Sequence, residues 1–71
     1  MFHDYYVNKL TTTNPNFNHE VHKSTCPYLP SANNRVYLGY FSSCSAAMLR
    51  AKMYFTNVDG CAMCCPECHR K

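Results

Sequence analysis

The sequence has no hydrophobic run that approaches the roughly 20 apolar residues of a transmembrane helix. Charged residues are also scarce: they make up 15% of the 71 residues, whereas hydrophobic residues make up 46%. Disordered chains show the opposite balance, with high charge and low hydrophobicity. Internal repeats and low-complexity segments are absent as well. The composition therefore predicts a soluble globular protein and excludes a membrane-spanning or a disordered one.

A secretory signal is also missing from the first ten residues, because no basic segment precedes an apolar one and no small-residue cleavage site follows. We therefore expect a cytoplasmic protein, as Met1 at the start of the sequence also suggests, and separately we expect a monomer. Its thiols would be kept reduced there, and closely spaced cysteines would bind metal rather than pair. The alternative is a secreted chain without its signal, in which the six cysteines form disulfides.

Two further features are lacking, a basic stripe and a catalytic motif. The seven Lys and Arg residues are scattered and the net charge is +3, which permits an anionic partner without requiring one. A hydrolytic zinc site needs an open coordination position and a general base. The segment His19-Glu20-Val21-His22 has the wrong spacing for the H-E-x-x-H motif. We predict that the protein is not an enzyme.

The chain is long enough for one domain, over 1–71, with a core too small to be stable alone. Domains of this size bury only about 60% of the surface of the unfolded chain. The entropy cost, about 1.5 kcal/mol per ordered residue, roughly cancels the gain from apolar burial. Six cysteines and four histidines are available to crosslink such a fold.

The residue pattern predicts an α+β fold, with a small three-stranded sheet, one helix packed on it and a C-terminal cysteine knuckle held by zinc. The expected strands cover 4–10, 19–23 and 35–41, and the helix covers about 43–55. Turn-forming residues over 11–18 predict a loop, and Asp59-Gly60 predicts a turn.

For two of these elements the pattern also predicts which side chains share a face. In the third strand, Val36, Leu38 and Tyr40 should share one face and Tyr37 and Phe41 the other, with a possible bulge at Gly39. The helix should begin at a Ser42 or Ser43 cap. Its apolar stripe, which places Cys44 in the core, consists of Cys44, Ala47, Met48, Ala51 and Phe55.

The C-terminal knuckle carries the strongest chemical signal. Two adjacent Cys-x2-Cys steps, Cys61 to Cys64 and Cys65 to Cys68, lie within eight residues, and His22-x3-Cys26 supplies a second arm upstream. Zinc prefers four tetrahedral sulfur and nitrogen ligands, and such pairs can bend onto one ion. We predict one zinc ion held by four of five candidates, namely His22, Cys26, Cys61, Cys64 and Cys68.

At several positions an ordinary structural or surface role is an alternative to metal binding. A lone histidine such as His22 is as often an ordinary hydrogen-bonded residue as a ligand. His3 and His19 are expected at the surface, and Cys65 is the knuckle cysteine least suited to join the ion. Thioredoxin-like chemistry is excluded because no βαβ pattern precedes the cysteines.

The order of these segments resembles a known family. Val21-His22-Lys23-Ser24-Thr25-Cys26, Phe41-Ser42-Ser43 before a helix with Ala46-Ala47, and Gly60-Cys61-Ala62-Met63-Cys64 resemble the zinc-binding N-terminal domain of the Ada DNA-repair protein and its small bacterial relatives. The resemblance covers about 21–64.

This resemblance implies that His22 and Cys26 form the first ligand pair and Cys61 and Cys64 the second. It also implies possible contact with nucleic acid. In the Ada repair domain a cysteine of the first pair accepts a methyl group, but His22 stands in that place here, so methyl transfer is not expected. Cys68 remains an alternative to His22 or Cys61.

We therefore expect a non-enzymatic zinc-binding module with a structural metal, contacting nucleic acid. One alternative is a protein-interaction module, which the many tyrosines favour. The other is a thiol redox or metal-sensing protein in which Cys64, Cys65 and Cys68 switch between metal-bound and disulfide states.

Overall fold

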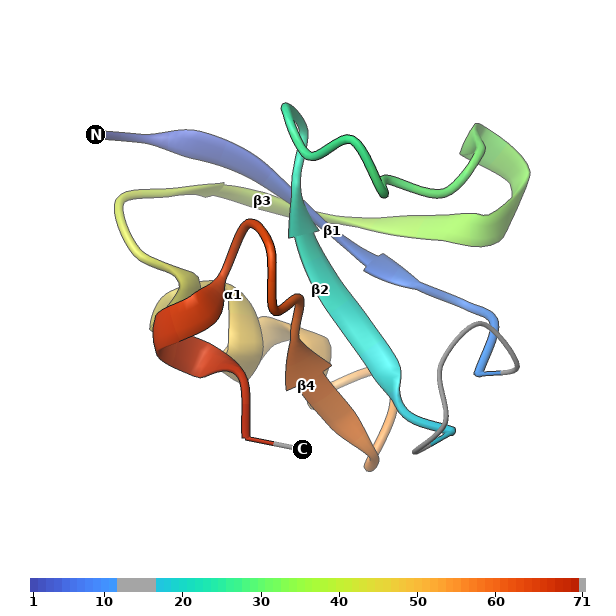
Figure 1. Cartoon of the computed structure of the whole chain (residues 1–71). Coiled ribbons are helices and arrows are strands. Elements are labelled where there is room, and N and C mark those ends of the chain that lie inside the picture. Colours follow the sequence, from blue (N-terminus) through green and yellow to red (C-terminus); the bar gives the residue numbers. More distant parts are fainter. Residues whose placement is uncertain (12–16, 71) are drawn as a thin grey trace.

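The computed structural model describes residues 1–11 and 17–70 and confirms the α+β class, with one α-helix of the described residues packed on a mixed sheet (Figure 1). The sheet has four strands, so the prediction of three was wrong. They are β1 (His3–Asn8), β2 (His19–Lys23), β3 (Arg35–Phe41) and β4 (Val58–Gly60). The helix α1 spans Cys44–Ala51, and two short 3₁₀ helices span Ala32–Asn34 and Pro66–Cys68.

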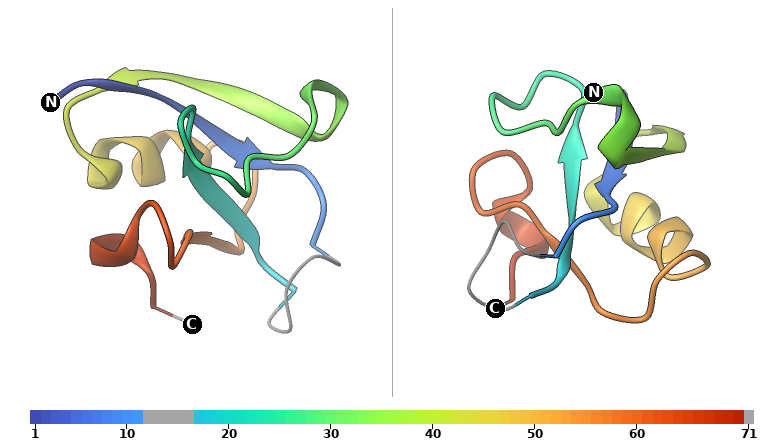
Figure 2. Two further views of the ribbon diagram at one scale, coloured as in Figure 1. Left: turned by 45° about the horizontal axis from the view of Figure 1, so that its top comes forward. Right: turned by 90° about the vertical axis from the view of Figure 1, so that its right-hand side faces the viewer.

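The strands lie in the order β3-β1-β2-β4. β1 pairs antiparallel with both β2 and β3, whereas β4 runs parallel to β2. Helix α1 covers one face of this sheet, and the loop after β2 lies on the opposite side (Figure 2). No helix in the described part of the chain is long and apolar enough to cross a membrane.

The core lies between α1 and the sheet. Tyr5 and Val7 of β1, Val21 of β2 and Leu38 of β3 are buried in it. The predicted apolar stripe of the helix is confirmed, since Cys44, Ala47 and Ala51 are buried and Met48 and Phe55 pack against them. Because side chains alternate along a strand, those at odd positions of β1 and β2 point toward the helix and those at even positions point away from it.

Helix α1 begins where the sequence predicts but ends earlier. Ser43 is the N-cap, and its side chain accepts a hydrogen bond from the backbone N–H of Ala46 at 3.5 Å. After Ala51 the chain turns, and the N–H groups of Tyr54 and Phe55 both donate to the Ala51 carbonyl. This turn lets the Phe55 ring stack on His19 with 3.8 Å between the ring centroids.

The bulge predicted at Gly39 is present and changes the faces of β3. The register shifts between Tyr5 and Tyr6 of β1, which pair with Gly39 and Tyr37, and Gly39 has a φ of +135°. An extra residue in one strand turns the following side chains to the other face. Tyr40 is therefore exposed, and Phe41 packs against the core, the reverse of the predicted faces.

Strand β4 corrects a second expectation, because Asp59 and Gly60 lie in a strand and not in a turn. All three residues of β4 are buried, and they pair with His19, Glu20 and Val21 of β2. Tertiary pairing here overrides the local turn preference of the Asp-Gly dipeptide.

The two remaining expectations concern the first strand and the loop after it. Strand β1 ends at Asn8, two residues earlier than predicted, because Asn8 Oδ1 accepts a hydrogen bond from the Leu10 N–H at 2.9 Å. Residues 12–16 of the predicted loop lie outside the described residues, as does residue 71.

Gly60 should tolerate no side chain. A Cβ atom at this position would lie 2.7 Å from Cys68 Cβ and 2.9 Å from the Cys65 carbonyl oxygen. We expect Gly60→Ala to lower the free energy of unfolding by about 1–3 kcal/mol, the usual cost of overpacking. Urea denaturation measures this change. Ser45→Ala, on the exposed face of α1, should stay within about 0.5 kcal/mol, and an equally small effect at Gly60 would contradict the close packing.

Candidate metal centre

The parallel pairing of β2 and β4 brings two distant segments of the chain together. Parallel strands end at the same edge of a sheet, so the segments that follow them start side by side. His22 lies on β2 and Cys26 follows it, whereas Cys61 and Cys64 follow β4. The Cys61 N–H donates to the Val21 carbonyl at 3.0 Å and joins the two segments.

Tight turns place the cysteines of each segment. The Cys26 N–H donates to the Lys23 carbonyl at 3.0 Å, which turns the chain back after β2. The Cys65 N–H donates to the Cys61 carbonyl at 2.8 Å, which closes the turn containing Cys64. The cysteines of both segments therefore return to the end of the sheet that their segments leave.

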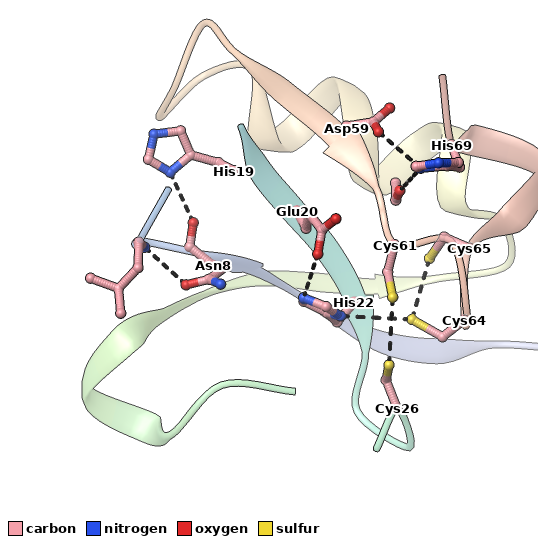
Figure 3. A network of polar contacts seen from close by, with 12 residues as sticks. Asn8, His19, Glu20, His22, Cys26, Asp59, Cys61, Cys64, Cys65 and His69 are labelled. Atoms are coloured by element: carbon pink, nitrogen blue, oxygen red, sulfur yellow. Dashed lines mark hydrogen bonds and ion pairs between the residues drawn. The ribbon is translucent and has the colours of Figure 1, made fainter. Parts of the chain in front are cut away.

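The result is a compact group of one imidazole and three thiols. His22, Cys26, Cys61 and Cys64 each offer one ligand atom, and these four atoms all lie within 4.8 Å of one another. Figure 3 shows the four side chains converging from the two segments. Such a group has a geometry that could hold a metal ion.

The distances within this group agree with those of a tetrahedral site. Zn–S bonds of about 2.3 Å separate two sulfur ligands by about 3.8 Å in a tetrahedron. Cys26 Sγ and Cys61 Sγ are 3.8 Å apart, and Cys64 Sγ lies 4.0 Å from His22 Nδ1. All four atoms lie within 4.8 Å of one another, so a contraction of at most about 1 Å would let them share one ion.

Burial sets the protonation of these groups in the absence of metal. It lowers the pKa of His22 to about 4, so the imidazole is neutral at pH 7, which is the form that binds metals. It raises the pKa of Cys61 to about 12 and also raises the pKa of Cys26. A metal ion reverses this preference, since a coordinated thiol loses its proton.

Two neighbouring groups lie close to the cluster. Glu20 lies two residues before His22 on the same face of β2, and its Oε1 is 3.9 Å from His22 Nε2. Metal-bound histidines usually present their second nitrogen to such a carboxylate. The Lys23 N–H donates to Cys64 Sγ at 3.3 Å. Sequence reasoning missed the role of Glu20, although its spacing from His22 contains the signal.

The structure separates Cys68 from the other four candidates. Cys68 forms a disulfide with Cys44 of α1, with 6.5 Å between the Cα atoms, and it is not part of the four-residue group. The sequence placed Cys44 in the core, where it lies, but no spacing signal pairs it with Cys68. Cys65 is fully buried in the core, with its Sγ 3.9 Å from Cys64 Sγ.

Two other histidines, His19 and His69, have different partners. His19 is half-buried and stacks on Phe55, and its Nδ1 donates to the Asn8 carbonyl at 2.9 Å. His69 Nδ1 lies 3.0 Å from the buried Asp59 carboxylate and 3.1 Å from the Gly60 carbonyl. These contacts fasten the end of the knuckle to β4. Neither histidine belongs to the four-residue group.

Comparisons with known proteins identify no relative: no family model, no curated protein and no solved structure matches this chain.

Substitution distinguishes the ligands from the disulfide cysteines. We expect His22→Ala or Cys61→Ser to weaken metal binding by more than about 100-fold, because removing even an outer partner costs about 10–100-fold. The double variant Cys44→Ser/Cys68→Ser should still bind one ion per chain. Native mass spectrometry against an acid-denatured sample measures the stoichiometry. Loss of metal in the double variant, with retention in His22→Ala, would show that the ligands are misassigned.

Proposed function

We propose that this protein is a small zinc-binding module in which the metal has a structural role. The observation that supports the proposal most directly is the four-residue group of His22, Cys26, Cys61 and Cys64. It unites two segments of the chain, with Cys26 and Cys61 35 positions apart. One ion there would hold the end of the sheet together.

The donor set favours zinc among the metals. Three thiols and one imidazole form one of the usual tetrahedral sets of structural zinc sites. Harder cations such as magnesium and calcium prefer oxygen ligands, which this group does not offer. Four protein ligands also fill the tetrahedron and leave no position for a substrate or a reactive water. The proposal therefore includes no catalytic step.

The proposal keeps the cytoplasmic location and the monomeric state expected from the sequence. A reducing compartment opposes persistent disulfides. The Cys44–Cys68 bond would then be open for part of the time, and the metal would be the crosslink that persists.

Removal of zinc should destabilise the fold strongly. Structural zinc contributes about 10–16 kcal/mol of apparent binding free energy in finger peptides. About 1 kcal/mol shifts the Tm of a domain of this size by about 4–8 °C. We therefore expect a strong chelator to lower the Tm by at least about 20 °C in non-reducing buffer. Thermal unfolding followed by circular dichroism measures it, with zinc re-addition as the control. An unchanged Tm would refute a structural role.

The proposal also includes contact with nucleic acid. The Ada-like order of motifs favours it, and the exposed rings of Phe2, just before β1, and of Tyr37 and Tyr40 on β3 support it. Phe2 and Tyr40 stack with 5.2 Å between centroids, and Tyr6 lies 5.3 Å from Tyr37. The Arg35 guanidinium lies over the Tyr6 ring at 4.6 Å. Exposed aromatic rings can stack on unpaired bases.

This contact predicts binding of single-stranded DNA that weakens as salt rises from about 50 to about 200 mM, because phosphate contacts release counterions. Fluorescence anisotropy of a labelled oligonucleotide measures it. Tyr40→Ala should weaken binding several-fold, whereas Tyr54→Ala, equally an exposed tyrosine but one that follows α1, should not. Absence of binding at low salt would contradict the contact with nucleic acid and would favour a protein partner for the aromatic surface.

The redox alternative has less support. It requires a thiolate that reacts rapidly, and reactive cysteines are partly exposed. Cys65 has a lowered pKa because the Cys64 thiol donates to it, but its side chain is fully buried. Cys64 is partly exposed, but its pKa is raised by its hydrogen bond to Cys65 and by burial. Cys68 is already joined to Cys44.

A further inference from the structure

A cavity of about 480 Å³ lies directly beside the candidate metal centre, and Glu20 and His22 line it from the face of β2 that points away from α1. Cavities of roughly 300–1,000 Å³ are the size that holds small ligands. It is lined by Asn8, Glu20, His22, Tyr28, Pro30, Cys61, Ala62 and Met63. Apolar side chains of the two segments around the metal centre form its walls, and polar groups of β1 and β2 form its floor.

The floor contains a buried polar atom that lacks a hydrogen-bond partner. His22 is 1% exposed, and its Nε2 makes no hydrogen bond. Glu20 Oε1 is the nearby carboxylate oxygen, but 3.9 Å is beyond hydrogen-bond length. With Nδ1 turned toward the thiols, Nε2 carries the ring proton and is a donor without an acceptor. Figure 3 shows this nitrogen facing Glu20.

The charge of the cavity favours a cationic ligand. Among the described residues that line the cavity, Glu20 is acidic and none is Lys or Arg. A divalent ion held by three thiolates and a neutral imidazole adds a net charge of −1 beside it. The Tyr28 ring, 63% exposed at the rim, can contact a cation through its face.

We propose that this cavity binds an α-ammonium group together with its neighbouring carbonyl oxygen, the chemistry shared by an amino acid amide and a peptide N-terminus. The ammonium pairs with the Glu20 carboxylate. The carbonyl oxygen accepts the hydrogen bond from His22 Nε2. The ligand thereby bridges the gap between these two groups, and an apolar first side chain packs against Tyr28, Pro30 and Met63.

This inference rests on the proposed zinc site, because the cavity shares His22 and Cys61 with it. Metal content is therefore measured on every sample by native mass spectrometry. A protein without metal would overturn both proposals, whereas a zinc-loaded protein that ignores the ligand would overturn this one alone.

The test is an NMR titration of the ¹⁵N-labelled, zinc-loaded protein at constant pH with the tripeptide Leu-Gly-Gly-amide. We expect saturable shifts at the amides of Tyr28, Ala62 and Met63, with a dissociation constant below about 1 mM. The N-acetylated tripeptide lacks the ammonium and should bind at least about 10-fold more weakly. Equal binding of the two peptides, or no shifts up to about 10 mM, would overturn the proposal.

Variants identify the groups that bind. Glu20→Gln keeps the shape of the side chain, removes its charge and should weaken binding at least about 10-fold. Glu67→Gln makes the same change at an exposed position outside the cavity and should alter binding less than about twofold. A metal-loaded Glu20→Gln protein with unchanged affinity would refute the ion pair.

If Glu20→Gln loses its metal or unfolds, Tyr28→Ala provides a second variant that removes no metal ligand. It should weaken binding several-fold, with Tyr54→Ala as the matched control, and an unchanged affinity would count against the cavity. Leucinamide separates the two sources of the ligand. Tighter binding of the tripeptide indicates a peptide N-terminus, and equal binding indicates a free amino acid derivative.

Discussion

The parallel pairing of β2 with β4 is the constraint on which the site depends. Only three residues of β4 take part, and their partners in β2 are 39 residues away. So short a strand cannot persist by its own ladder, because isolated strand pairs are marginal in water. The pairing nevertheless sets the positions of both cysteine segments. Contacts beyond the ladder must therefore stabilise β4.

Those contacts come from both faces of the sheet. On the face away from the helix, the group of one histidine and three cysteines joins the ends of β2 and β4. On the helix side, the disulfide between Cys44 and Cys68 fastens the knuckle to α1. Between them, the close contact of Gly60 with Cys68 leaves no room for a side chain. A small core is thus supplemented by a disulfide, and the proposed metal would add a second crosslink of different chemistry.

The sequence predicted the parts of this arrangement that follow from local patterns. The bounds of β2 and β3, the start of α1 and its buried stripe could be read from periodicity and capping. Strand β4 could not be predicted in this way, because Asp59-Gly60 locally favours a turn and forms a strand only through its pairing with β2. The faces of β3 after Gly39 were misassigned for a related reason. A bulge was expected at Gly39, but the predicted faces continued the alternation of side chains past it and ignored the shift in register that a bulge causes.

The candidate ligands show a similar division. Spacing predicted that the two segments meet and named all four residues that the structure brings together. Spacing also left Cys68 as a fifth candidate, because the sequence gives no sign that Cys68 lies close to Cys44.

The two crosslinks also share one stretch of chain, since Cys61 and Cys64 lie inside the loop that the disulfide closes. In the oxidised unfolded chain that disulfide offers a shorter path between the two ligand segments, so the chain entropy lost on metal capture is smaller. Oxidation and loading of the proposed metal would therefore be coupled through the connectivity of the chain, without any shared atom.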